Sequence, residues 1–392
     1  MRSTGLLAAA TSLITISGPA TAADASATAD AAEARAMVEG ESPIVVHGER
    51  DSYGVPRTST ATKTDTPVKD IPQAMTVITE GQIEDQGLRS VGDLLMFVPG
   101  ATPGTGEGNR DQVTLRGNTT SADFFRDGIR DDVQYFRDLY NVERVEVLKG
   151  PNAMIFGRGG GGGVINRVTK RSTLNPAREF ALSGDSEGGF RLTGDLDQPL
   201  GRGLGLRVNG VYEDGESFRR HVELERYAIN PTVGILAGPA TRIDLAYEYL
   251  HDRRTADRGL PSRNGEPLEG HDRTFFGDPD RSFSRADVHI ASIALDHNFG
   301  GGLSLRNRTL AGDYDKFYQN IYPSSAVSTA GNVTLAAYSD TTKRRNLFSQ
   351  TDLVWGGRIG GIDQTLLAGF ELGGSTGRNQ RNNGVFAATG TG

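Results

Sequence analysis

The sequence contains no cysteine, so no disulfide can hold its fold together in any compartment. It also lacks any run of about 18 apolar residues, the length that a membrane-spanning helix requires. Only six histidines are present, and they show no ligand-like spacing, so we expect no metal held by the protein itself. The net charge of −7 argues against a nucleic-acid partner.

Hydrophobic residues make up only 36% of the chain, whereas glycines number 52. This composition suits an outer-membrane β-barrel, in which alternate residues of each strand face lipid. At the N-terminus, Met1 and Arg2 precede an apolar run from Leu6 to Ile16, and the small-x-small pattern of a signal-peptidase site follows at 20–22. We therefore expect residues 1–22 to be a cleaved signal peptide and any membrane insertion to use strands.

Residues 23–66 are predicted to form a disordered linker, because alanine and aspartate dominate its first part and serine, threonine and aspartate its second. Within it, residues 43–48 (PIVVHG) form a short β-branched island with nothing local to pack against. Such a tethered segment is a candidate for strand addition to the edge of a partner's sheet. A stray hydrophobic patch, or a first strand of the next domain, is the alternative interpretation.

Residues 67–175 are predicted to form a compact mixed domain. The capping box of Ser90 and Asp93 marks the start of one helix, and Pro99-Gly100 marks its end. Another helix begins near Thr79, and strands are expected over 74–79, 113–116, 124–126, 142–148 and 164–169. The five consecutive glycines at 159–163 favour a tight, closely packed loop, with a flexible linker as the alternative.

From residue 176 to 392 the sequence predicts long alternating strands. Leu204, Leu206 and Val208 place apolar side chains on one face, while Arg207 and Asn209 occupy the other. Short turns alternate with long connections, as periplasmic turns and extracellular loops do in an outer-membrane barrel; a soluble β-sandwich is the alternative. The predicted strands, about nine in number, span 178–186, 188–198, 204–215, 225–237, 241–252, 286–299, 302–318, 345–356 and 363–373.

Four motifs, in this order and spacing, resemble those of TonB-dependent siderophore receptors. They are PIVVHG at 43–48, KDIPQAMTVITEGQI with SVGDLLMFVPG at 69–100, VTLRG with FFRDGIRDD at 113–132, and ERVEVLKGPNAMIFGRGGGGGVINRVTK at 143–170. The resemblance implies a mixed α/β plug domain inside a transmembrane antiparallel β-barrel. The family barrel has 22 strands, so residues 176–392 would supply only its N-terminal part.

The resemblance also implies a function, namely active uptake of ferric siderophores across the outer membrane of a Gram-negative bacterium, without enzymatic activity or a cofactor. TonB, acting with ExbB and ExbD, would pull on the TonB box, and outer-membrane lipid and lipopolysaccharide would surround the barrel. The run from 130 to 160 looks closer to catecholate-type receptors than to hydroxamate-type ones. Another cargo, such as cobalamin, an oligosaccharide or a different metal chelate, is the alternative, because a fold does not fix its ligand.

In the family, loop apices of the plug face the outside and bind the iron chelate, so that iron is held through the siderophore. A ferric catecholate is anionic and aromatic, which suits arginine, tyrosine and phenylalanine. The apices here would be 104–111, 118–123 and 133–138. The resemblance assigns the TonB box to Pro43, Ile44, Val45, Val46 and His47, siderophore binding to Arg110, Gln134, Tyr135, Phe136 and Arg137, and plug–barrel anchoring to Arg116 and Lys149.

One difference from the family pattern and two alternative functions bear on this interpretation. The small, odd strand number predicts a C-terminally truncated or partial chain. Residues 184–188 (GDSEG) match the G-x-S-x-G nucleophile elbow, but the alternating strand that follows predicts a hairpin where the elbow needs a helix. A signalling receptor with an extra N-terminal domain is disfavoured, because only about 20 residues separate the predicted cleavage site from Ile44, fewer than a domain needs.

Overall fold

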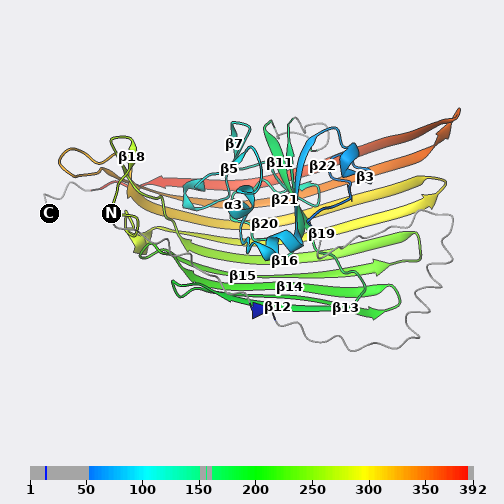
Figure 1. Ribbon diagram of the computed structural model, residues 1–392, viewed down its shortest axis with the longest axis horizontal. Helices are drawn as coiled ribbons and strands as arrows, with labels where there is room; N and C mark the ends of the chain where they lie inside the picture. Colours follow the sequence, from blue (N-terminus) through cyan, green and yellow to red (C-terminus); the bar gives the residue numbers. More distant parts are fainter. Residues whose placement is uncertain (1–13, 16–52, 151–155, 157–160, 387–392) are drawn as a thin grey trace, which may run out of the picture.

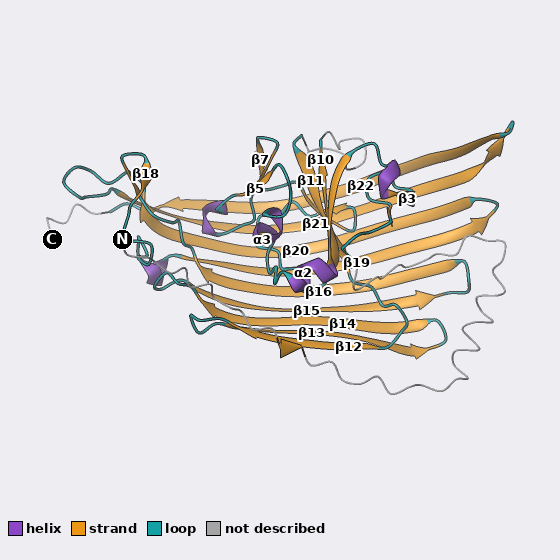
Figure 2. Cartoon of the chain, viewed as in Figure 1, coloured by secondary structure: helices purple, strands orange, loops and turns teal. Residues whose placement is uncertain are grey.

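The computed structural model describes residues 14–15, 53–150, 156 and 161–386. The second half of the chain forms a broad, curved antiparallel sheet, and residues 53–173 form a smaller mixed unit against it (Figure 1). The helices are short (Figure 2). No helix in this described part of the chain is long and apolar enough to cross a bilayer. The smaller unit lies where the sequence predicts the plug domain and is called the plug.

The barrel sheet has ten strands in the order β1-β12-β13-β14-β15-β16-β19-β20-β21-β22. β1 is a two-residue segment, Ile14–Thr15, that pairs with β12. The other strands follow one another as an antiparallel meander, which confirms the predicted strands. Their bounds are β12 (Ala177–Gly184), β13 (Phe190–Gly201), β14 (Leu204–Glu216), β15 (Glu223–Leu236), β16 (Thr241–Thr255), β19 (Phe283–Gly300), β20 (Leu303–Pro323), β21 (Leu335–Ile359) and β22 (Ile362–Asn383).

Alternation along these strands places apolar side chains on the outward face and many polar ones against the plug, beside a smaller buried apolar cluster that includes Leu250 and Ile290. On β13, Phe190 and Leu192 are exposed on the outward face, whereas Arg191, Asp195 and Asp197 are buried. A soluble sandwich would bury its apolar face, so this inverted arrangement excludes that alternative and is typical of a barrel with a polar interior.

The plug is built around a five-stranded sheet in the order β4-β10-β11-β8-β9. β10 pairs antiparallel with both β4 and β11, and β8 runs parallel to β11. The bounds are β4 (Ala74–Thr79), β8 (Phe124–Arg126), β9 (Ile129–Arg130), β10 (Val142–Lys149) and β11 (Gly163–Thr169); a smaller sheet holds β5 (Ala101–Pro103), β6 (Val113–Leu115) and β7 (Asn118–Thr120). The remaining strand pairs are β2 (Arg57–Thr58) with β3 (Thr66–Pro67), and β17 (Ser262–Arg263) with β18 (Glu266–Pro267).

The helices of the plug start where their caps predict. In α3 (Val91–Leu95), Ser90 Oγ accepts from the Asp93 amide and the Asp93 carboxylate accepts from the Ser90 amide, which is a complete capping box. α2 (Glu80–Asp85) is capped by Thr79. Both helices pack on one hydrophobic core with β10 and β11. The single-turn 3₁₀ segments are η1 (Val68–Asp70), η2 (Gly106–Gly108) and η3 (Pro279–Arg281).

The described end of the glycine run packs tightly against neighbouring backbone. A Cβ on Gly163 would lie 2.3 Å from the Leu148 carbonyl oxygen, and one on Gly162 would lie 2.4 Å from that of Leu115. Gly163 also has a φ of +148°, which side-chain-bearing residues rarely adopt. For these two residues the structure confirms close packing; Gly159 and Gly160 lie outside the described residues.

Replacing Gly163 with alanine should therefore destabilise the plug by about 1–3 kcal/mol, the usual effect of an added group in a closely packed site. Gly161→Ala is a matched control, because its nearest neighbour would be the Asn118 side chain at an ordinary 3.6 Å. Hydrogen exchange of the β10 and β11 amides measures the difference. Equal exchange in the two variants would contradict the packing argument.

Candidate functional site: the contact between plug and barrel sheet

The plug contacts the barrel sheet through one apolar cluster, in which Ile129 and Val133 pack with Leu250 and Ile290 of the sheet, and through charged and polar side chains. They come from inward-facing positions of the sheet strands and from loops and strand ends of the plug. Burying a charge costs several kcal/mol unless it is paired and hydrogen-bonded. The contact therefore depends on how completely each charge is matched.

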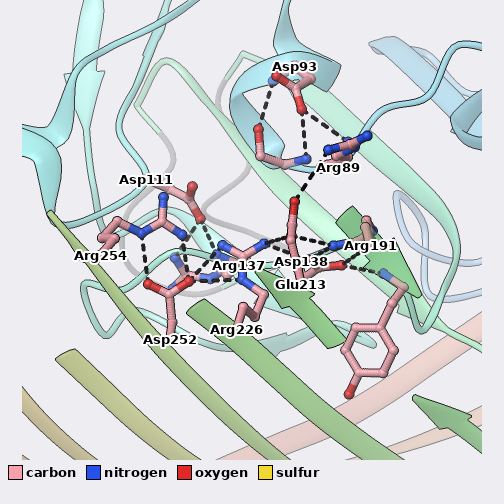
Figure 3. Close-up of polar contacts among 12 residues, drawn as sticks. Arg89, Asp93, Asp111, Arg137, Asp138, Arg191, Glu213, Arg226, Asp252 and Arg254 are labelled. Atoms are coloured by element: carbon pink, nitrogen blue, oxygen red, sulfur yellow. Dashed lines mark hydrogen bonds and ion pairs between the residues drawn. The ribbon is translucent and has the colours of Figure 1, made fainter. Parts of the chain in front are cut away.

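Asp138 of the plug is enclosed by two arginines of the sheet (Figure 3). Arg191 of β13 donates to its two carboxylate oxygens at 2.8 and 2.6 Å, and Arg226 of β15 donates at 2.5 Å. The same arginines reach Glu213 of β14 at 2.7 Å and Asp252 of β16 at 2.7 Å. Burial opposes ionisation of Asp138, but the two guanidinium groups outweigh it and hold the pKa of this carboxyl well below its usual range.

Arg137, the preceding residue, points into the plug (Figure 3). Its Nε donates to the Asp131 carboxylate at 2.9 Å, and one terminal nitrogen donates to the carbonyls of Asp131 and Val133, each at 2.6 Å. Its main-chain N–H donates to the Asp111 carboxylate at 2.9 Å. Arg137 thus ties the 133–138 apex to Asp131 and to the 104–111 apex.

Glu248 of β16 accepts from three plug side chains. Arg126 forms an ion pair with it, the Tyr140 hydroxyl donates to it at 3.0 Å, and the Asn141 amide donates to it at 2.9 Å. Asn141 also donates to Asn230 of β15 at 3.1 Å. Because these donors flank β10 and lie in β8, Glu248 fixes the central sheet of the plug to the barrel wall.

The chain is tied to the sheet again where it leaves the plug. The Lys170 ammonium donates to Asp195 of β13 at 3.0 Å. Two and three residues further on, the Ser172 and Thr173 hydroxyls donate to Asp197 at 2.7 and 2.9 Å. The entry into β12 is therefore anchored before the strand begins.

Two loop apices of the plug are held to β20 by one lysine. The Lys316 ammonium donates to the Asn109 carbonyl at 2.8 Å, to the Asn109 side-chain oxygen at 2.5 Å and to the Gln134 carbonyl at 2.8 Å. All three acceptors are neutral oxygens. Lys316 therefore joins the 104–111 and 133–138 apices to the same point of the barrel wall.

The long connection after β16 also touches the 104–111 apex. A Cβ on Gly108 would lie 2.6 Å from the Asp257 carbonyl oxygen, so only glycine allows this approach. The Tyr318 hydroxyl of β20 donates to the neighbouring Glu107 carbonyl at 2.8 Å. These contacts place the apex at the end of the sheet that carries the long connections.

Three of the predicted ligand-binding residues are at least partly accessible. Gln134 is exposed, and Phe136 is half-buried with the Arg254 guanidinium 3.8 Å from its ring centroid. Arg110 is 17% exposed and pairs with Glu107 at 2.6 Å. These residues present an arginine–aromatic surface, although Arg110 already has a carboxylate partner.

Two of the predicted ligand-binding residues, Tyr135 and Arg137, are buried in this structure, and their direct contact with a ligand stays a prediction. They are 3% and 0% exposed, and the Tyr135 hydroxyl donates to Asp131 at 2.8 Å. Burial raises the pKa of Tyr135, and the Asp131 charge adds to that shift. The loop from 133 to 138 has no period from which inward and outward positions could be told apart.

Arg116 and Lys149 form no ion pair with the barrel sheet among the residues that the structure describes. Arg116 is exposed, and Lys149 donates to the Thr76 hydroxyl at 3.0 Å and to the Pro99 carbonyl at 3.1 Å. Burial lowers the pKa of Lys149, and the Arg116 charge lowers it further. Anchoring by these two residues stays a prediction.

The sequence interpretation missed the anchors that the structure shows. Asp138, Arg191, Arg226 and Glu248 bring together segments far apart in the chain, so no local motif marks them. One signal was available, because charges at inward positions of a barrel strand need partners. The TonB box at 43–48 and the signal peptide, apart from residues 14–15, lie outside the described residues.

A cavity of about 310 Å³ lies between the apices and strands β13 to β16. Phe136 and Gly108 line it from the plug, and Glu213 and Arg254 line it from the sheet. A guanidinium group stacked on an aromatic ring at such a cavity can bind a flat anionic ligand by charge and by stacking.

Replacing Asp138 with asparagine should destabilise the plug by about 3 kcal/mol, because two buried arginines lose their shared counter-charge. Hydrogen exchange of β10 and β11 is the measurement. Asp315→Asn is the control, since Asp315 pairs with Lys343 on the exposed outward face, where an ion pair contributes about 0–1 kcal/mol. Equal exchange in both variants would contradict the assignment.

This anchor has a defined pH dependence. The folded-state pKa of Asp138 lies below the unfolded value of about 3.9. Its contribution to stability is therefore fully present above about pH 4 and is lost as the pH falls through the folded-state value. The difference between native protein and Asp138→Asn should shrink below about pH 4.

Residues 67–164 match the family described as TonB-dependent Receptor Plug Domain. The probable TonB-dependent siderophore receptor PiuA of Acinetobacter baumannii is 30% identical over 256 residues, which cover 62% of this chain and 34% of the relative. The catecholate siderophore receptor Fiu of Escherichia coli K12 is 28% identical over 393 residues, covering 92% and 51%. The metal-pseudopaline receptor CntO of Pseudomonas aeruginosa PAO1 is 30% identical over 341 residues, covering 83% and 46%.

Solved structures agree with this comparison. The crystal structure of PiuA superposes with a TM-score of 0.79 at 26% identity, covering 84% of this chain and 49% of that one. The open form of Fiu gives a TM-score of 0.73 at 26% identity, covering 79% and 50%. The chain thus spans about a third to a half of the length of these proteins. Residues 67–164 are a TonB-dependent receptor plug domain, and together with the strands that follow they give the chain the plug-and-barrel fold of the TonB-dependent receptors.

Proposed function

We propose that this chain serves TonB-dependent uptake of ferric siderophores across the outer membrane, as a transporter without an enzymatic step. The observation that carries the proposal is the position of the plug, which fills the polar face of the sheet and presents two apices beside the long connection after β16. A ligand bound at these apices would rest on the element that must move to let it pass. The names of the relatives PiuA and Fiu support a siderophore as the ligand.

The ligand proposed is an anionic, aromatic iron chelate of the catecholate type, and iron enters only as part of that cargo. Phe136 and Arg254 at the cavity suit a flat aromatic group, and Arg110 and Gln134 offer donors on the neighbouring apex surface. Tyr135 and Arg137 shape the same apex from inside.

The energy for uptake is proposed to arrive through TonB, acting with ExbB and ExbD. An inner-membrane potential supplies about 2.3 kcal/mol per charge per 100 mV. The TonB box, residues 43–48 on the 23–66 linker, would pair with TonB as an added strand and pull on the plug at 67–175. Residues 1–22 would be the signal peptide that sends the chain to the outer membrane, where the outward face of 176–392 meets lipid and lipopolysaccharide.

A second candidate is uptake of a different metal chelate. The similarity to the metal-pseudopaline receptor CntO favours it, because that relative covers 83% of this chain. The two candidates share the fold and the coupling to TonB and differ only in the chelate. The chelate that supports growth distinguishes the two candidate functions.

We expect a deletion strain carrying the gene in its complete form to grow under iron limitation on a ferric catecholate, and the same gene with Val45→Pro to fail. Proline removes the donor that strand addition needs, so uptake is lost while chelate binding stays. Growth on a panel of ferric chelates, with binding of the radiolabelled chelate to whole cells, measures both properties.

Val38→Pro, in the same linker but outside the box, is the control and should grow normally. Normal growth of Val45→Pro would overturn the TonB-box assignment. Growth on a pseudopaline-like chelate alone would replace the catecholate proposal with the second candidate.

Phe136→Ala should weaken ferric-catecholate binding about tenfold, because it removes both the stacking surface and the ring under Arg254. Phe299→Ala is the matched control, since Phe299 is 56% exposed on the outward face of β19. Equilibrium binding to the purified receptor gives the two affinities. If Phe136→Ala bound the ferric catecholate with unchanged affinity, the binding site would have to be assigned to the barrel loops instead.

A further inference from the structure

One carboxylate of the 104–111 apex holds two arginines at the end of the sheet that carries the long connections. One carboxylate oxygen of Glu107 lies 2.6 Å from Arg110 of the same apex, and the other lies 3.7 Å from Arg258 of the connection after β16. In the described part of the chain, neither arginine forms an ion pair with any other carboxylate. The group of Glu107, Arg110 and Arg258 is called the apex clasp.

The neighbouring carboxylates do not share these two arginines. Asp257 pairs with Arg219 at 2.8 Å, and Asp340 of β21 lies beyond ion-pair distance of both arginines of the clasp. Lys316 adds another cation beside the apex, and its hydrogen-bond acceptors there are neutral oxygens. Glu107 therefore supplies the counter-charge of the clasp.

Tyrosines of the barrel wall surround Arg258. Its guanidinium lies 4.3 Å from the centroid of the Tyr322 ring, and one of its nitrogens lies 3.5 Å from the hydroxyls of Tyr318 and Tyr338. A guanidinium stacked on an aromatic ring presents positive charge and a flat apolar surface together. An anionic aromatic chelate needs both, so the surroundings of Arg258 match the proposed cargo.

The backbone that presents Glu107 is strained. Gly106, Glu107 and Gly108 have φ values of +56°, +57° and +70°, so three consecutive residues lie in the left-handed region. Glycine adopts this region freely, whereas glutamate rarely does and is kept there only by surrounding contacts. Here the contacts are the two arginines on the carboxylate and the Tyr318 hydroxyl on the carbonyl. Strain of this kind gathers at ligand sites and switches, where a change of partner can release it.

Glu107 is held in its charged form. Burial opposes ionisation, but Arg110 and Arg258 outweigh it and lower the pKa of this carboxyl. The buried Nε of Arg110 has no hydrogen-bond acceptor in the part of the chain that the structure describes. The clasp thus already contains an anion, while Arg110 keeps one donor unused.

We propose that Glu107 occupies the anion site of the apex in place of the ligand, and that an anionic chelate must displace this carboxylate to reach Arg110 and Arg258. The inference rests on the proposed function in one respect, namely that the cargo is an anionic chelate. Arg258 then joins Arg110 as a residue that determines specificity. A neutral chelate offers the two arginines no replacement charge, so Glu107 excludes it from the clasp.

The test measures equilibrium binding of two probes to the purified complete receptor, a trianionic ferric tris-catecholate and a neutral ferric tris-hydroxamate. Glu107→Gln removes the internal competitor at almost unchanged size and should bind the tris-catecholate about fivefold more tightly, the effect of one partly exposed ion pair. Arg258→Gln removes a cation of the site and should bind it about fivefold more weakly. Neither variant should change the affinity for the tris-hydroxamate.

Asp257→Asn is the matched control. It removes one negative charge from the connection that touches the apex, while Glu107 keeps both arginines. Its affinity for the tris-catecholate should change by less than about twofold. An equal gain in Asp257→Asn and Glu107→Gln would overturn the proposal, because the field of any nearby carboxylate would then explain the effect.

Carbodiimide-driven labelling of carboxylates in the native receptor follows the displacement directly. Glu107 should react more when the tris-catecholate is bound, because its carboxylate leaves the arginines, whereas Asp257 should react equally with and without the chelate. Unchanged or reduced labelling of Glu107 would overturn the displacement.

The outcomes separate this inference from the proposed function. If the native receptor binds the tris-catecholate and Glu107→Gln binds it with the same affinity, the inference alone is refuted. If neither the native receptor nor any variant binds the tris-catecholate, the proposed cargo is refuted and the inference with it.

Discussion

Paired charge across the plug and barrel contact is the constraint on which the rest of the structure depends. On its inward face the sheet offers the plug many polar side chains, together with one apolar cluster in which Leu250, Ile290 and Leu310 pack with Ile129 and Val133 of the plug. Hydrophobic burial therefore supplies one part of the contact, and Asp138, Glu248 and Asp197 supply the other through charge and hydrogen bonds. Such a contact is specific in register and becomes separable once water can solvate the parted charges.

Three consecutive residues connect the cavity, the interior of the plug and the barrel wall. Phe136 lines the cavity, Arg137 binds the interior of the plug, and Asp138 binds the barrel wall. A ligand that moved Phe136 would act on the two residues that hold the apex and the anchor. The proposed ligand surface and the attachment of the plug therefore lie on one short segment, where a small displacement would affect both.

Local features of the fold were predictable from the sequence, because their causes are local. Ser90 and Asp93 define a helix start, and alternation around Val208 defines a barrel strand and its faces. The ion pair between Asp138 and Arg191 joins residues 53 apart and has no local cause. Strand β21 was also underestimated, because residues 335–344 lack apolar alternation and owe their strand form to pairing with β20 and β22.

The position of β4 has a mechanical consequence. Among the described residues, this six-residue strand is the edge of the plug sheet and pairs only with β10, whereas β10 also pairs with β11. Tension that enters the plug from its N-terminal side would first load the contacts of residues 57–67, where Lys63 pairs with Asp352 of β21 and Thr58 donates to Glu146 of β10, and then the β4 ladder. The anchors at Glu248 and Asp197 follow later in the chain path. The plug would therefore yield in stages that follow the chain, with the single ladder of β4 parting after the Lys63 contact and before the anchors at Glu248 and Asp197.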